Sequence, residues 1–351
     1  MNRGITVGMD MGDKNHRICV LDTEGRVLRR SSVSNTGKAI RKHFGDLEPC
    51  RVAMEAGTHS GWVSRILQEL GHEVLVGNLR KLRVIWDSDE KGDDRDAEML
   101  ARIARFDPQL LYPIHHRGQK AQADLALIKA RDLLVKARTI LIAHARGAVK
   151  SSGQRISACS AEAFHVRLLE EMPVELMPAL DPVMKTIEEL TRRIRHYDKL
   201  LENLCAEKYP ETAGLRAISG VGPVTALAFV LTIEESSRFD NSRAVGPFLG
   251  LTPKRDQSGQ TDKQLRITKA GDAYLRRLLV GCAQYILGPF GPDCDLRRFG
   301  MKLAARGGKN AKRRAVIAVA RKLAVLMHHL WKSGAVYEPL FQERRQQNKV
   351  A

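Results

Sequence analysis

Four acidic residues occupy positions from which they could hold metal ions. Asp10 and Glu55 each end a short apolar segment, and Asp93 and Asp96 stand three residues apart on a predicted helix, which places them on one face. Converging carboxylates repel one another unless cations neutralise them. Oxygen ligands select Mg²⁺, and two ions about 3.5–4 Å apart can stabilise the attacking and the leaving oxygen of a phosphoryl transfer. We therefore expect these four residues to hold two Mg²⁺ ions, for which Mn²⁺ could substitute.

The elements that would position these carboxylates are strands and helices within residues 1–105. Apolar alternation and turn residues predict strands at 5–10, 17–22, 27–33, 51–54 and 72–76, and helical spacing predicts helices at 36–44, 60–70 and 93–105. Gly71 follows the second helix as its C-terminal cap. This order of elements is that of a ribonuclease H-like fold, in which the first and fourth strands are neighbours and the last helix packs across their ends. The four carboxylates would then converge.

Each carboxylate also has a structural interpretation. A single Asp at the end of a strand is commonly a turn or cap residue, so the role of Asp10 stays open when it is taken alone. Asp87 and Asp94 are alternatives to Asp93 and Asp96. The set of four, in this order along the chain, favours the metal site.

A serine could supply a nucleophile in the C-terminal part of the chain. Ser258 lies in Gln257-Ser258-Gly259, within residues 246–268, which are predicted to be rich in loops. A serine hydroxyl is a weak nucleophile and needs a base, a metal or neighbouring cations. Because the sequence has no Gly-x-Ser-x-Gly elbow, a hydrolase triad is not expected. From the segment alone, the favoured interpretation of Ser258 is a turn residue in a polar loop.

Two long helices are predicted in the middle of the chain, at residues 119–150 and 181–208. Both carry an apolar stripe at helical spacing with charged residues on the other faces. They predict a helical hairpin or coiled-coil-like arm, and two helices of a compact bundle are the alternative. Residues 151–171 between them show no clear periodicity.

The C-terminal block is predicted to be mainly helical. Residues 213–231 are typical of two helices joined by a tight turn at Gly220 and Gly222, and further helices are expected at 272–287 and 309–331. The turn resembles a helix-hairpin-helix, whose backbone N–H groups hold phosphates without contacting bases. A plain interhelical turn with Pro223 at the helix start is the alternative. The tail after Glu338 is polar and expected to fray.

The charge of the chain points to nucleic acid. The formal net charge is +18, with 58 Lys and Arg against 40 Asp and Glu, and such a surface attracts polyanions. The densest cationic run, residues 297–332, contains no Asp or Glu and includes Lys309, Lys312, Arg313 and Arg314. A solvated helix face is the less favoured interpretation. Aromatic residues make up 5% of the chain, so a base-stacking platform is not expected and backbone contacts fit better.

Other features of the sequence restrict its class and location. The six cysteines form no Cys-x-x-Cys pair, which argues against a zinc knuckle or a disulfide framework and fits a reducing cytosol. We see no apolar core of a signal peptide and no apolar run of about 18 residues. We therefore expect a cytoplasmic protein with no membrane partner.

Three short motifs around the carboxylates resemble a known family. They are Val7-Gly8-Met9-Asp10, Met54-Glu55-Ala56-Gly57-Thr58 and Lys91-Gly92-Asp93-Asp94-Arg95-Asp96-Ala97. Each is similar to an acidic motif of the DEDD transposases of bacterial insertion sequences, a family that includes Piv-type DNA invertases and bridge-RNA-guided recombinases. Gly92 stands where the family usually has Thr, but the two carboxylates keep their spacing. The resemblance implies a RuvC-like N-terminal domain.

A second signature of the same family lies in the C-terminal block. Gly250-Leu251-Thr252-Pro253, Gln257-Ser258-Gly259 and the basic helix that starts near Lys269-Ala270-Gly271-Asp272 follow in the family's order. The resemblance implies that Ser258 is the nucleophile that attacks DNA and forms a phosphoserine link. It also makes a group of nearby cations candidates for clamping phosphates: Arg266, Lys269, Arg276 and Arg277.

The predicted protein is therefore an α/β plus all-α transposase with four parts. These are a RuvC/RNase H-like catalytic domain (1–110), a helical arm (111–210), a C-terminal transposase domain with the serine (211–335) and a tail (336–351). By resemblance, its partners are donor and target DNA, a guide RNA and further copies of the chain in a dimer or tetramer. The resemblance also implies a prokaryotic, nucleoid-associated location.

Three alternative functions remain open from the sequence. The first is a RuvC-like, junction-resolving nuclease that uses water in place of Ser258. The second is an actin-like ATPase or sugar kinase, suggested by Gly8-Met9-Asp10-Met11-Gly12, although its other nucleotide motifs are not visible and the net charge would be unexplained. The third is a nucleic-acid-binding protein without catalysis, against which the intact carboxylates argue.

Overall fold

The computed structural model describes residues 4–78, 81, 92–259 and 261–350. Asp87, one of the alternative acidic residues, lies outside the described residues. Contacts within the chain define two compact units, Met1–Gln119 and Lys120–Ala351. The arm and the C-terminal block, predicted as separate domains, thus belong to one unit.

The first unit is built on a five-stranded sheet. Its strands are β1 (Thr6–Asp10), β2 (Asn15–Leu21), β3 (Val27–Ser34), β4 (Arg51–Glu55) and β5 (Glu73–Gly77), in the spatial order β3-β2-β1-β4-β5. β1, β2 and β3 pair antiparallel, whereas β4 runs parallel to both β1 and β5. All five predicted strands are confirmed. This strand order, with the first and fourth strands adjacent, is the one expected of a ribonuclease H-like fold.

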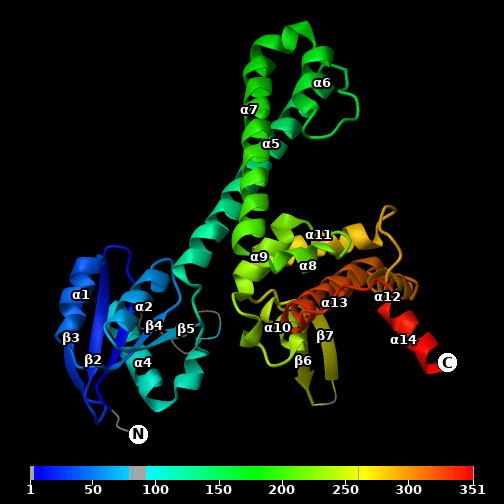
Figure 1. Cartoon of the computed structure of the whole chain (residues 1–351). Helices are drawn as coiled ribbons and strands as arrows, with labels where there is room; N and C mark the ends of the chain where they lie inside the picture. Colours follow the sequence, from blue (N-terminus) through cyan, green and yellow to red (C-terminus); the bar gives the residue numbers. More distant parts are fainter. Residues whose placement is uncertain (1–3, 79–80, 82–91, 260, 351) are drawn as a thin grey trace. The chain divides into compact units, whose positions relative to one another are not determined.

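Helices cover both faces of this sheet (Figure 1). Val7 and Met9 of β1 point to the face covered by α1 (Gly37–Gly45) and α2 (Ser60–Glu69), where they share a buried cluster with Phe44 and Leu67. α4 (Asp93–Phe106) covers the opposite face through its own buried alanines and leucine. A short helix, η1 (Pro108–Leu111), follows. Successive residues of β1 point to opposite faces of the sheet, so they pack alternately against α1 and α2 on one side and against α4 on the other.

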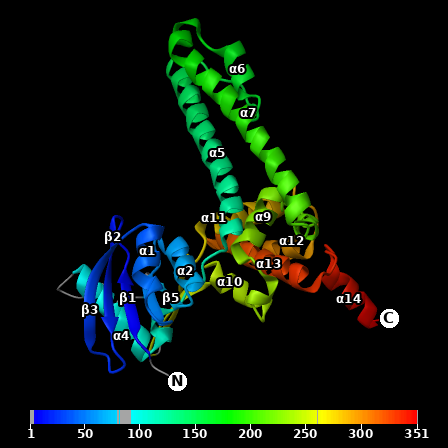
Figure 2. The same cartoon turned by 60° about the vertical axis from the view of Figure 1, so that its left-hand side comes forward.

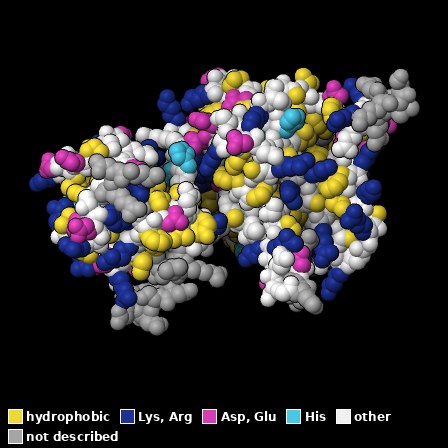
Figure 3. All heavy atoms as spheres, turned by 90° about the horizontal axis from the view of Figure 1, so that it is seen from below, with side chains coloured by type: hydrophobic (Ala, Val, Ile, Leu, Met, Phe, Trp, Pro, Cys, Tyr) yellow, Lys and Arg dark blue, Asp and Glu magenta, His cyan; other side chains and the backbone are white. Residues whose placement is uncertain are grey.

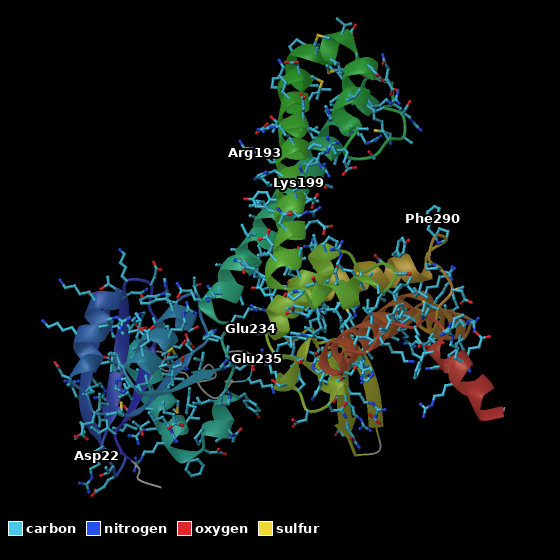
Figure 4. The ribbon with its side chains drawn as sticks, in the orientation of Figure 1. Asp22, Arg193, Lys199, Glu234, Glu235 and Phe290 are labelled. Atoms are coloured by element: carbon cyan, nitrogen blue, oxygen red, sulfur yellow. The ribbon has the colours of Figure 1, made fainter. Side chains whose placement is uncertain are left out.

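The second unit begins with the helical arm. α5 (Gln119–Ser151) and α7 (Met177–Lys208) run side by side as a long hairpin, and α6 (Phe164–Glu171) and η2 (Val174–Leu176) lie between them in the chain (Figures 1 and 2). Arg138, buried on α5, donates hydrogen bonds to Thr191 on α7 and to Glu162. Arg193 and Lys199 project outward from α7 (Figure 4). Helix α6 occupies a segment for which the sequence showed no periodicity.

The C-terminal block packs around one buried helix, α9 (Pro223–Ile233), in which every residue from Thr225 onward is buried. The elements around it are α8 (Thr212–Arg216), η3 (Ser236–Arg238), η4 (Ser242–Ala244), α10 (Val245–Phe248), α11 (Ala273–Leu287), α12 (Asp295–Ala304) and α13 (Ala311–Ser333). The predicted pair of helices around Gly220 and the predicted helix at 272–287 are confirmed. α13 begins two residues later than predicted.

Two expectations for the C-terminal part were wrong. Residues 246–268, predicted to be rich in loops, contain an antiparallel hairpin of β6 (Pro253–Ser258) and β7 (Thr261–Ile267). The tail, expected to fray, forms α14 (Phe341–Val350), in whose first turn Glu343 accepts a hydrogen bond from Arg298. None of the described helices combines the length and the apolar composition needed to cross a bilayer.

Candidate active site

Asp10 and Glu55 lie at the same edge of the sheet. β1 and β4 are parallel neighbours with Met9 opposite Met54, so the next residue of each strand, at its carboxyl end, is one of the two carboxylates. Asp93 and Asp96 lie in the first turn of α4, the helix packed on β1. The two strands and the helix that carry the predicted metal ligands are therefore direct neighbours.

Burial, together with repulsion among these carboxylates, raises the pKa of two of them. The pKa of Asp10 rises to about 6, mainly because the side chain is partly buried and then because Asp93 and Asp96 are negative. The pKa of Glu55 rises to about 7, again through burial first and then through Asp10 and Asp96. Asp93 and Asp96 thus act on Asp10, and Asp10 and Asp96 act on Glu55. Asp94, an alternative member, instead faces Arg17, 3.9 Å away.

The donor set fits a hard divalent cation. Carboxylate oxygens in a partly buried position are ligands of Mg²⁺, and a cation would remove the repulsion that raises the two pKa values. Among the residues that the structure describes, no three His, Cys, Asp or Glu side chains are close enough to form a finished metal site. A cation held by Asp10, Glu55, Asp93 and Asp96 would therefore have to draw the side chains closer together.

A further group beside these carboxylates escaped the sequence reasoning. Trp62 Nε1 donates to His59 Nδ1 at 3.3 Å, and His59 Nε2 lies 3.3 Å from Asp13 Oδ1. Asp13 follows Asp10 by three residues, and His59 follows Glu55 by four. The His59–Asp13 contact thus links the loop that follows β1 to the loop that follows β4. The nearness of these two residues in sequence to Asp10 and Glu55 was the only signal that could have identified them.

Ser258 lies in the second unit, at the end of a narrow hairpin. It is the last residue of β6, pairs with Thr261 of β7 and is exposed. Next to it, Arg255 donates from Nε and Nη2 to the two carboxylate oxygens of Asp262, at 2.8 and 2.6 Å. The hairpin therefore presents the serine hydroxyl on a ribbon whose two strands are joined by a forked ion pair.

The cations predicted near Ser258 have different surroundings. Arg266, on β7, and Lys269 are exposed. Arg276 donates to the carbonyl oxygens of Leu249 and Ala270 at 2.9 and 2.7 Å, so it braces the segments before and after the hairpin. Arg277 reaches the arm, where it donates to Asp132 at 2.6 Å.

The remaining predicted cations lie around the start of α13. Lys309 precedes the helix and Lys312, Arg313 and Arg314 lie in its first turn, all exposed. None of the four forms an ion pair with a residue that the structure describes. The second unit holds 39 Lys and Arg against 23 Asp and Glu, whereas the first holds 19 against 17. Nearly all of the excess positive charge therefore belongs to the second unit. Many of its cations lie on the surface (Figure 3).

Comparison with known proteins finds transposases among the family models and among the relatives of higher identity. A DEDD transposase model of the IS110 group, described as "Transposase", matches residues 7–152, and the model "Transposase IS116/IS110/IS902 family" matches residues 213–293. A probable family 20 transposase of Pseudomonas aeruginosa is 27% identical over 95% of this chain and 98% of its own length.

Two transposases of named insertion sequences are also similar. The transposase of element IS1111A from Coxiella burnetii is 27% identical over 92% of this chain and 88% of the relative. That of element IS1328 from Yersinia enterocolitica is 28% identical over 79% of this chain and 82% of the relative. The acidic edge of the sheet falls in the first matched region and Ser258 in the second. The chain belongs to the IS110/IS116 family of DEDD transposases, enzymes that act on DNA.

Proposed function

We propose that this transposase cuts and rejoins DNA by metal-dependent phosphoryl transfer, with Ser258 as the nucleophile. The Oγ atom of Ser258 attacks the scissile phosphorus and gives its proton to water, and the bond from phosphorus to the leaving sugar oxygen breaks as that oxygen takes a proton from water. The resulting phosphoserine keeps the phosphate ester, so a hydroxyl of another strand can attack it, rejoin the DNA and release the serine. The observation that carries the proposal is the set of mutually repelling carboxylates at the ends of β1 and β4.

The proposal assigns separate roles to the two units. Asp10, Glu55, Asp93 and Asp96 hold the cation, two Mg²⁺ ions in the full site, at the sheet edge. When bound, Mg²⁺ supplies the positive charge that stabilises the attacking and leaving oxygens. The β6–β7 hairpin delivers the hydroxyl. Because Ser258 and the carboxylates belong to different units, the units must meet during the reaction, within one chain or between two copies.

Binding of nucleic acid is assigned to the cationic second unit. Arg266, Lys269 and Arg277, with the cluster at the start of α13, contact phosphates of donor and target DNA. Such contacts set position and carry no base sequence. As the resemblance to bridge-RNA-guided recombinases implies, a structured guide RNA that pairs with the DNA supplies the specificity. Copies of the chain associate through the arm, where Leu133 and Ile140 of α5 are 65% and 68% exposed. The protein acts in the cytoplasm on the nucleoid.

The nucleophile is tested by replacing Ser258 with Ala. Ser258→Ala should bind DNA like the unaltered protein but form no protease-sensitive protein–DNA adduct, and strand exchange should fall at least about a thousandfold. Ser333→Ala, which removes another exposed hydroxyl of the same unit, is the control. An adduct in the Ser258→Ala protein would overturn the assignment. Cleavage without an adduct in the unaltered protein would support the nuclease that uses water.

The guide is tested on the purified protein. RNA that copurifies with it should be one structured species encoded beside its gene, and nuclease removal of that RNA should abolish site-specific exchange. Full activity of RNA-free protein on defined DNA sites would contradict a guide.

A further inference from the structure

The C-terminal block contains a groove beside Arg277 and the turn at Gly220 and Gly222, residues for which the sequence predicts contacts with phosphates. It has a volume of about 750 Å³ and lies between α11 and residues 217–222, the hairpin that joins α8 to α9. Its walls include two arginines, Arg216 and Arg277, and two glycines, Gly222 and Gly281. Neither an Asn nor a Gln lines it, so the side chains that most often distinguish adenine are missing from its walls.

The two glycines leave space that the protein itself does not use. A Cβ atom added to Gly222 or to Gly281 would meet no atom within 4 Å. Gly222 has a φ of −90°, which any residue adopts, and Gly281 lies inside α11, where glycine is less stable than alanine. Gly220 differs, because its φ is +86° and an added Cβ would lie 2.9 Å from Tyr285 Cδ1. Gly220 is explained by the fold, whereas the other two glycines permit close approach from outside.

The two arginines are each held by a carboxylate of an arm helix. Arg216 donates from both terminal nitrogens to Glu202 of α7, at 2.8 and 3.1 Å. Arg277 donates to Asp132 of α5 at 2.6 Å, and Lys136 also pairs with Asp132 at 2.8 Å, so that carboxylate is neutralised from two sides. The arginine side chains remain 37% and 51% exposed. A guanidinium has five N–H donors, so each arginine keeps donors for a second, external anion.

We infer that this groove holds the phosphate backbone of duplex DNA, with Arg216 and Arg277 as the clamps and Gly222 and Gly281 as the points of closest approach. Planar guanidiniums match phosphate oxygens in pairs of hydrogen bonds. Glu202 and Asp132 orient the two arginines. Because both carboxylates lie on arm helices, the position of these helices determines how the arginines face the DNA. The inference rests on the proposed function only in that the chain must bind DNA. It does not depend on Ser258.

Substitution of the glycines separates binding from folding. Gly281→Ala should leave the unfolding temperature unchanged or raise it, because the new methyl group meets no atom and alanine favours a helix. Gly222→Ala should lower it only slightly, because its methyl group also meets no atom but alanine is a poorer N-cap of α9 than glycine. Both should weaken binding to duplex DNA at least about tenfold, because the methyl group occupies the place of the phosphate. Gly147→Ala is the matched control, since Gly147 also lies inside a helix with an open Cβ position but outside the groove.

Salt dependence of binding tests the arginines. Arg216→Ala and Arg277→Ala should each reduce the slope of log affinity against log salt by about one. Arg192→Ala, which removes an arm arginine paired with Glu189, should leave the slope unchanged. Binding and slope like those of the unaltered protein in the Gly and Arg variants would overturn the inference, as would loss of RNA binding with duplex DNA binding retained. If these variants lose DNA binding while the unaltered protein forms no serine adduct, the groove stands and the serine mechanism fails.

Discussion

Gly8 in β1 lies directly against the backbone carbonyl of Ala97 in α4, with no room for a side chain between them. Gly8 precedes Asp10 by two residues, and Ala97 follows Asp96 by one. The close approach of strand and helix therefore fixes the height of the first turn of α4 above the end of β1. This contact, made by residues without a charge, sets the spacing of the charged ones.

We predict that Gly8→Ala damages catalysis more than folding. The added methyl group pushes α4 from β1 and should cost about 1–3 kcal/mol of unfolding free energy, as overpacking does. Because Asp93 and Asp96 move with α4, the Mg²⁺ concentration for half-maximal strand exchange should rise at least about tenfold. Urea unfolding and a Mg²⁺ titration measure the two effects. Gly45→Ala, at an open position at the end of α1, is the control, and an unchanged Mg²⁺ requirement in Gly8→Ala would contradict the argument.

Removing one carboxylate should stabilise the metal-free protein. Asp10 is repelled by Asp93 and Asp96, so Asp10→Asn should raise the unfolding free energy at pH 8 by about 1 kcal/mol, after allowance for its partial exposure to solvent. The same variant should lose strand exchange and the stabilisation that Mg²⁺ gives. Asp94→Asn, which loses an exposed ion pair with Arg17, should change stability by less than about 0.5 kcal/mol. Destabilisation by Asp10→Asn would show that the carboxylates do not repel in the folded state.

The raised pKa values of Asp10 and Glu55, caused first by burial and then by repulsion, predict a pH dependence of stability with a definite sign. Because the folded pKa values of Asp10 and Glu55, about 6 and about 7, exceed their ordinary values, the folded state binds more protons than the unfolded state between about pH 4 and 7. Their contribution to stability therefore falls as the pH rises through this range. The gain in stability from Asp10→Asn with Glu55→Gln should accordingly grow from about pH 5 to 8 and shrink when Mg²⁺ is added. Calorimetry of both proteins at matched pH measures it, and a gain independent of pH would refute it.

The sequence predicts the first unit better than the second for a physical reason. Val7 and Met9 are buried in β1, so the strand has a periodic apolar signal, and parallel pairing with β4 then places Asp10 beside Glu55. β6 has no such signal, because all six of its residues are exposed. It pairs through its backbone and the Arg255–Asp262 ion pair, which hydrophobic patterning cannot reveal. The His59–Asp13 contact was missed for the same reason: it joins polar residues of two loops.

The register of the β6–β7 hairpin should control Ser258. Arg255 and Asp262 join the strands close to the serine, and hairpins without a buried face slip readily. Arg255→Asp and Asp262→Arg should each slow adduct formation by about two- to fivefold, since exposed ion pairs contribute about 0.2–1 kcal/mol. The double variant, with the two charges exchanged, should recover most of the rate. Its net charge equals that of the unaltered protein, so binding of DNA should recover too.

The control for this exchange is Arg298 with Asp293, another exposed forked pair in the same unit but on α12 and the loop before it. Exchanging those two residues should leave the rate of adduct formation unchanged. If the double variant at positions 255 and 262 stays as slow as the single variants while it binds DNA normally, Arg255 acts through its own contact with DNA. In that case the ion pair does not position the serine.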